Sequence, residues 1–129
     1  MKVLLFDIDG TLIRGGGAGR KALNRAALKL YGVKNACSEL SLAGRTDLYN
    51  FAQTYRFATG KKPTPRAVER LHREYLNFLP FYVRSAIRSK TYHIPPGLKT
   101  LLKRLSRDKR VLLGLGTGNM EKGARIKLE

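Results

Sequence analysis

Two short apolar runs, each ending in a polar turn, limit most strongly what this chain can fold into. The first is Val3–Phe6, directly before residues 7–9 (DID), and the second is Val111–Leu115, directly before residues 116–119 (GTGN). Short apolar runs bounded by turn residues are typical of buried strands. Helical patterns fill the interval between them, and a strand–helix–strand order favours a parallel sheet with a right-handed crossover. The expected fold class is therefore α/β.

Apolar residues that recur three and four positions apart predict the helices. Leu23, Ala26, Ala27 and Leu30 share one face of a helix that Gly32 should end. Further helices are expected over about 46–58, from residue 68 to Pro80, over about 81–89, after the prolines at 95 and 96, and from about residue 120. Pro80 is expected to interrupt the helix that starts near residue 68, which is the third helix of the chain.

The helical interval is too long for a simple crossover, which indicates an inserted domain. We therefore predict a partial core over residues 1–13 and 92–129 and a helical cap over residues 14–91. The glycines at positions 15, 16, 17 and 19 would form a flexible hinge between the two.

Composition excludes several classes of protein. A chain of 129 residues with 43% apolar residues can bury the core of one domain. Cys37 is the single cysteine, so no internal disulfide is possible, and we expect it, like His72 and His93, to be structural. No apolar stretch approaches the roughly 18–20 residues that span a membrane. The apolar run at the start of the chain is interrupted by Asp7 and is too short to be a signal peptide. A cytoplasmic protein without membrane contact is the expectation.

The charge balance is strongly basic. There are 26 Lys and Arg against 9 Asp and Glu, a formal net charge of +17. Such a field attracts polyanions, whether nucleic acid or anionic substrates. No zinc-finger spacing, heptad repeat or RNA-binding motif with stacking aromatics accompanies the charge. A non-catalytic basic module that binds nucleic acid or another polyanion is therefore kept as the alternative to an enzyme.

Polar residues follow both predicted strands. In a parallel sheet, the loops beyond the carboxyl ends of the strands converge, which brings Asp7 and Asp9 near Thr117, Gly118 and Asn119. A hydroxyl beside the N–H groups of a helix start is a phosphate site. Two carboxylates can hold a divalent cation and divide the roles of nucleophile and proton carrier. Together these residues indicate phosphoryl transfer.

Two other glycine-loop readings fail. A Walker loop needs Lys-Ser or Lys-Thr after its last glycine, whereas Gly16 follows Gly10–Gly15 and Ala124 follows Gly118–Gly123. In the run GLGTGN, the third glycine of a dinucleotide fingerprint is replaced by Asn119.

The sequence FDIDGTL at residues 6–12 resembles the first motif of the haloacid dehalogenase-like hydrolase superfamily, and LLGLGTGN at 112–119 resembles its second. The runs GRTD at 44–47 and TGNMEKGARIKLE at 117–129 look like segments of its phosphoglycolate phosphatase-like branch. This resemblance implies a Rossmann-like parallel-sheet core, incomplete here, with an inserted α-helical cap. It also implies Mg²⁺-dependent hydrolysis of a small phosphate ester such as 2-phosphoglycolate.

The resemblance also implies roles for individual residues. Asp7 resembles the nucleophile that forms an aspartyl-phosphate, and Asp9 the acid/base, with Asp7 and the Asp9 carbonyl holding Mg²⁺. Arg45 either reaches from the cap to a substrate anion or is an exposed surface arginine. The implied phosphate- or substrate-binding residues are Ile8, Gly10, Thr11, Thr117, Gly118, Asn119 and Arg45.

The family pattern further requires a Lys or Arg that binds the phosphoryl group, and one or two more acids, on strands beyond the second. We therefore expect the chain to be the front part of such an enzyme, weakly active or inactive alone, with a complementing C-terminal half as a possible partner. The charged residues after the second motif cannot be given these roles by their position. They are Glu121, Lys122, Arg125, Lys127 and Glu129.

Overall fold

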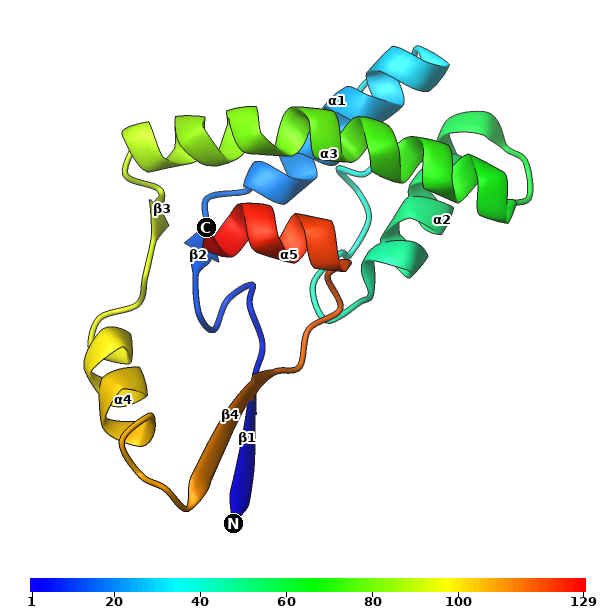
Figure 1. Ribbon diagram of the computed structural model, residues 1–129. Coiled ribbons are helices and arrows are strands. Elements are labelled where there is room, and N and C mark those ends of the chain that lie inside the picture. The colour runs from blue at the N-terminus through cyan, green and yellow to red at the C-terminus, as the bar shows by residue number, and fades with distance from the viewer.

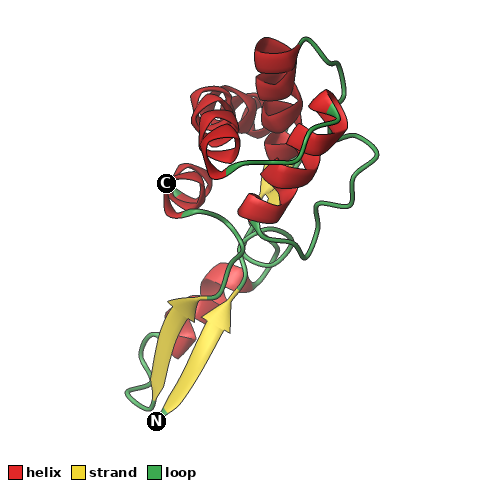
Figure 2. Ribbon diagram, turned by 90° about the vertical axis from the view of Figure 1, so that its right-hand side faces the viewer, coloured by secondary structure: helices red, strands yellow, loops and turns green.

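The computed structural model describes residues 1–129 and contains the predicted parallel strand pair (Figure 1). Strand β1 (Lys2–Phe6) lies beside β4 (Val111–Leu115), with Val3 opposite Leu112 and Leu5 opposite Gly114. Figure 2 shows both arrows pointing the same way, toward the group of helices. The carboxyl ends of the two strands therefore meet beside the helical part of the molecule.

A second, very short sheet joins the segment after β1 to a segment near Tyr92. Strand β2 (Arg14–Gly15) pairs antiparallel with β3 (Tyr92–His93). Two-residue strands carry no periodic pattern, so the sequence did not predict them. They lie where the boundaries between core and cap are expected, but the division itself stays a prediction. Gly16 follows β2 directly, and only glycine fits there. A Cβ on this residue would lie 2.4 Å from Thr91 Oγ1.

Five helices complete the fold. They are α1 (Ala18–Tyr31), α2 (Asp47–Thr59), α3 (Pro65–Arg88), α4 (Leu98–Leu105) and α5 (Glu121–Leu128). The hydroxyls of Thr46 and Thr64 cap α2 and α3 by accepting from the N–H three residues later. As expected, α1 ends at Gly32, whose φ of 70° is a left-handed conformation that suits glycine.

The prediction that Pro80 interrupts the third helix was wrong. Helix α3 runs unbroken through Pro80, so the separate helix expected over about 81–89 is part of α3. Its buried residues Leu71, Tyr75, Leu79 and Val83 recur every four positions and continue the same apolar face past the proline. That face packs against α1, and this contact offsets the backbone hydrogen bond that Pro80 cannot make.

The core lies among the helices and not under the sheet. Alanines of α1 face α3, and Cys37 and Phe51 complete the cluster, so the structural role predicted for Cys37 is confirmed. No residue of β1, β4 or α4 is buried. The side chains of Val3 and Leu5 are 59% and 66% exposed on one face of the strand pair. The sheet therefore presents an uncovered apolar face.

Helix α5 joins the two parts of the molecule. It follows β4 but packs against α3, and in Figure 1 it lies directly below that helix. Its Ala124 contacts Ile8 and Ile13 of the turn after β1. None of the helices is long and apolar enough to cross a membrane.

Candidate active site

A cleft of about 920 Å³ opens at the carboxyl ends of β1 and β4. Its walls are the turn after β1, the loop after β4, the first turn of α1 and the segment from Leu42 to Phe51. The cleft brings together most of the residues singled out in the sequence. Those that line it are Asp7, Asp9, Gly10, Arg45, Thr117, Gly118 and Asn119.

One polar network occupies the centre of this cleft. Lys127 Nζ lies 3.0 and 2.8 Å from the two carboxylate oxygens of Asp9. Asn119 connects the same groups, since its Nδ2 donates to Asp9 Oδ2 at 2.7 Å and its Oδ1 accepts from Lys127 Nζ at 2.6 Å. The Lys127 side chain is only 9% exposed, so this ion pair is sheltered from water on the lysine side. Both oxygens of Asp9 are therefore fixed in direction.

Lys127 is a candidate site residue that the sequence alone does not identify. Position relative to the second motif gave it no role, yet the structure places its ammonium on Asp9. Helix geometry offered a signal, because Gly123 lies four residues earlier and marks the same face as buried, as does Ala124 beside it. Burying a lysine ammonium costs free energy unless it has a polar partner, so a lysine on the buried face of this helix is expected to reach a polar group.

The hydroxyl of Thr117 is oriented by the same asparagine. It accepts from the Asn119 N–H at 3.1 Å and from Asn119 Nδ2 at 2.8 Å. A threonine hydroxyl has one hydrogen of its own, and both of these bonds leave it free for a ligand. Thr117 is thus a donor at the edge of the Asp9 network.

The turn after β1, from Asp7 to Thr11, uses most of its own main-chain N–H groups. The Ile8 N–H donates to Asp7 Oδ1 at 2.8 Å, the Gly10 N–H to the Ile13 carbonyl, and the Thr11 N–H to the Ile8 carbonyl. Ile8 is fully buried, and neither it nor Thr11 lines the cleft. In this conformation the main-chain N–H groups of Ile8, Gly10 and Thr11 are all used within the turn. The binding roles predicted for these residues therefore stay predictions.

Asp47, which ends the GRTD run, ties the helical part to the loop after β4. Its N–H donates to the Gly118 carbonyl at 2.8 Å, and its Oδ2 accepts from the Met120 N–H, at the start of α5, at 2.8 Å. Burial raises the pKa of Asp47, and the bond from Met120 and the charge of Lys127 oppose that shift. A Cβ on Gly118 would lie 2.7 Å from the Arg45 carbonyl, so this close approach requires glycine.

Arg45 lies in the cleft wall without an acidic partner. Its guanidinium carbon is 4.9 Å from the centre of the Tyr49 ring, a cation–π contact. It forms no ion pair within the protein, so its charge is available to an anion in the cleft. Its predicted role in substrate binding stays a prediction.

The oxygen atoms around Asp7 fit a Mg²⁺ ion, although no three His, Cys, Asp or Glu side chains cluster as a metal site. Asp7 keeps its Oδ2 without a hydrogen bond, and the Asp9 carbonyl accepts none from the protein. Mg²⁺ takes one or two protein oxygens and completes its octahedron with water and substrate phosphate. The Asp7 carboxylate and the Asp9 carbonyl would hold the ion, while the Asp9 carboxylate stays with Lys127.

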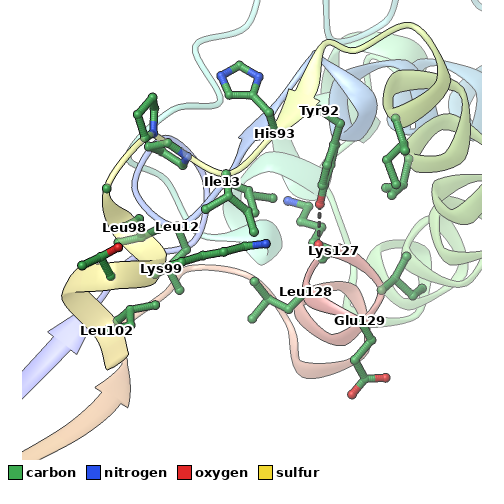
Figure 3. Close-up of a pocket in the computed structure, with 18 residues that line it drawn as sticks. Leu12, Ile13, Tyr92, His93, Leu98, Lys99, Leu102, Lys127, Leu128 and Glu129 are labelled. Carbon is green, nitrogen blue, oxygen red and sulfur yellow. Dashed lines mark hydrogen bonds between the residues drawn. The ribbon is translucent and has the colours of Figure 1, made fainter. Parts of the chain in front are cut away.

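A second cavity of about 730 Å³ lies beside the end of α5 (Figure 3). Its wall is mainly apolar, with Leu12 and Ile13 on one side, Leu98 and Leu102 of α4 on another, and Leu128 across from them. The dashed bond in Figure 3 joins the Tyr92 hydroxyl to the Lys127 carbonyl, which anchors the end of α5. Burial raises the pKa of Tyr92 to about 12, so this hydroxyl stays a donor. No carboxylate of the Asp7–Asp9 turn reaches this cavity.

Comparison with known proteins places the fold. No family model and no curated protein matches the chain. It is similar to the crystal structure, at 1.90 Å, of a predicted phosphoglycolate phosphatase from Haemophilus somnus 129PT, with a TM-score of 0.60 and 20% sequence identity. The match covers 95% of this chain and 53% of that one, so the chain spans about half the length of that structure. At this identity the likeness concerns the fold alone.

Proposed function

We propose that this chain carries the phosphoryl-transfer site of a haloacid dehalogenase-like, Mg²⁺-dependent phosphomonoesterase. The observation that carries the proposal is the convergence of Asp7, Thr117 and the Asp9–Asn119–Lys127 network in one cleft at the carboxyl ends of two parallel strands. A nucleophilic carboxylate, a held acid/base and a sheltered cation are the groups that this reaction needs.

The proposed reaction has two displacements at phosphorus. An oxygen of Asp7 attacks the phosphoryl group, the bond to the leaving oxygen breaks, and that oxygen takes a proton from Asp9, which enters this step as the carboxylic acid and leaves it as the carboxylate. Water then attacks the aspartyl-phosphate and returns a proton to Asp9, which releases phosphate and restores Asp7. Lys127 and the Thr117 hydroxyl stabilise the charge on the phosphoryl oxygens. Mg²⁺, when bound, neutralises charge between the phosphate and the Asp7 carboxylate.

The proposed substrate is a small phosphate ester, and 2-phosphoglycolate is the first candidate. Two findings support it: the segment from Leu42 to Phe51, a loop and the first turn of α2, forms one wall of the cleft, and the similar solved structure is described as a predicted phosphoglycolate phosphatase. A complementing C-terminal half remains part of the proposal. The uncovered apolar face at Val3 and Leu5, and the match to only 53% of that structure, both support it.

The test is Mg²⁺-dependent hydrolysis of p-nitrophenyl phosphate by the chain and by a version extended through the downstream reading frame. In the active form, Asp7→Asn should abolish turnover while the circular dichroism spectrum is unchanged, because an amide cannot attack phosphorus. Turnover by Asp7→Asn at the wild-type rate would refute the assignment of the nucleophile.

The alternative, a non-catalytic basic module, rests on the net charge of +17. It predicts no hydrolysis in either form, and binding to a single-stranded oligonucleotide that weakens steeply with salt. Hydrolysis that depends on Asp7 would exclude it as the primary function.

A further inference from the structure

Asn119 stands at the centre of the polar network in the cleft, and its side chain is fully engaged there. Its amide nitrogen donates to Asp9 Oδ2 at 2.7 Å and to Thr117 Oγ1 at 2.8 Å, and its amide oxygen accepts from Lys127 Nζ at 2.6 Å. These bonds use both amide hydrogens and the oxygen of the side chain. The direction of the Asp9 carboxylate therefore depends on where the main chain holds Asn119.

Asp47 holds the main chain on both sides of Asn119. Its N–H donates to the carbonyl of Gly118, the residue before, and its Oδ2 accepts from the N–H of Met120, the residue after, each at 2.8 Å. Asp47 begins α2 and lies 73 residues from Met120 in the sequence, so the helical part of the molecule supplies both bonds. Met120 begins α5 without a side-chain cap of its own, and the Asp47 carboxylate faces that helix start.

Two glycines allow this close contact between the two segments. A Cβ on Gly118 would lie 2.7 Å from the Arg45 carbonyl and 3.0 Å from Thr46 Cα, so the two main chains touch at this point. A Cβ on Gly123, in the first turn of α5, would lie 3.8 Å from Asp47 Oδ2. Asp47 is therefore enclosed between the loop after β4 and α5, where its hydrogen bonds are sheltered from water.

We propose that Asp47 is a positioning residue for the acid/base: by holding Gly118 and Met120 it fixes Asn119, and through Asn119 it directs the carboxyl group of Asp9. Asp47 itself touches no substrate and transfers no proton. The inference rests on the proposed phosphatase function and extends it, because protonation of the leaving oxygen then requires that the start of α2 be seated on the loop after β4.

Three variants test this role. Asp47→Ala removes the carboxylate that accepts from Met120 and keeps the main-chain N–H that bonds Gly118. Asp47→Asn is the conservative rescue, because its amide oxygen can still accept from the Met120 N–H. Thr64→Ala is the control for a loss of stability alone, since it removes the side-chain cap of α3 at a residue that does not line the cleft.

The kinetic measurement compares ethyl phosphate with p-nitrophenyl phosphate in the catalytically active form. The alkoxide that leaves ethyl phosphate needs the proton of Asp9, whereas p-nitrophenolate leaves with little help from an acid. Asp47→Ala should therefore lower kcat/KM about tenfold or more for ethyl phosphate and less than about threefold for p-nitrophenyl phosphate. Asp47→Asn and Thr64→Ala should stay within about threefold of wild type on both esters. Equal effects of Asp47→Ala on the two esters, or an equal loss in Asp47→Asn, would overturn the inference.

A measurement on the folded chain separates this inference from the proposed function. Exchange of the Asn119 side-chain amide hydrogens with solvent is followed by NMR, because both hydrogens are bonded within the network. Asp47→Ala should speed this exchange about tenfold or more, whereas Asp47→Asn and Thr64→Ala should leave it within about threefold of wild type. Unchanged exchange in Asp47→Ala would refute the role of Asp47 even where the esters are hydrolysed. Faster exchange without hydrolysis in any form would refute the phosphatase and leave the hold of Asp47 on Asn119 standing.

Discussion

One acidic and one basic residue of the cleft form an ion pair, Asp9 with Lys127, and this pair is the most informative feature of the site. Asp9 was assigned from its position after the first strand, because carboxylates at that edge of a parallel sheet face the ligand. Lys127 could not be assigned in this way. Its place depends on how α5 turns back against α3, a tertiary contact with no counterpart in local sequence patterns.

Lys127→Met should reduce the rate of hydrolysis by about a hundredfold or more, because one preorganised charge stabiliser is lost. Methionine keeps most of the length of the side chain without the ammonium that contacts Asp9. Lys122→Met on the same helix is the matched control, since Lys122 is exposed and makes no ion pair. The check is kcat/KM for p-nitrophenyl phosphate, and an equal loss in both variants would contradict the role of Lys127.

Asp47→Asn should stabilise the chain more at neutral pH than in acid. Since the folded-state pKa of Asp47 is raised, its favourable contribution is complete below the ordinary value of 3.8 and is lost as pH rises through the raised value. Asparagine never ionises, and its oxygen can still accept from the Met120 N–H. Urea unfolding at about pH 3.5 and about pH 7 measures the difference. A gain in the free energy of unfolding that is larger in acid would have the wrong sign.

Among the elements, the strands and the helix periodicities could be predicted, whereas the response of α3 to Pro80 could not. Local rules end a helix at a proline, since the ring removes one hydrogen bond and crowds the preceding turn. The outcome here depends on Leu79 and Val83 packing on α1 on either side of that bond. Such packing is visible only once the partner helix is in place. The β2–β3 pair escaped prediction for a related reason, because two residues have no pattern of their own.

Pro80→Ala should raise the free energy of unfolding by about 1–3 kcal/mol, because alanine restores the N–H that can bond the Leu76 carbonyl and relieves the crowding at that turn. Pro65→Ala is the control. Pro65 occupies the first turn of the same helix, where a missing N–H costs little, so this change should have a small effect. Thermal or urea unfolding compares the two, and a destabilised Pro80→Ala would show that the helix needs the proline.

For the whole molecule, the distribution of burial is uneven. Most of the fully buried side chains lie in α1, α2 and α3, whereas the two-stranded sheet leaves Leu112 and Leu115 more than half exposed, in addition to Val3 and Leu5. The apolar cavity beside α4 adds to this uncovered surface (Figure 3). Large exposed apolar patches are typical of interaction sites. The proposed C-terminal half, with further strands beside β1 or β4, would cover it.

The site residues at the strand ends could be predicted from the sequence, whereas those on the helices could not. Asp7, Asp9, Thr117 and Asn119 follow strands and could be placed from the sequence, because strand ends are fixed by the apolar runs before them. Tyr75 and Lys127 come from helices that reach the cleft across the molecule. Their side chains enter it through the packing of α1, α3 and α5, which no spacing in the sequence encodes.

The most direct test of phosphoryl chemistry at this cleft is the binding of beryllofluoride, an analogue of a phosphoryl group on a carboxylate. Fluorine NMR is recorded for the chain with and without Mg²⁺, and for the Asp7→Asn variant. We expect a bound signal that requires both Mg²⁺ and Asp7. A bound signal that persists in Asp7→Asn, or none in the wild-type chain in either its present or its extended form, would contradict the assignment of Asp7 as the residue that carries the phosphoryl group.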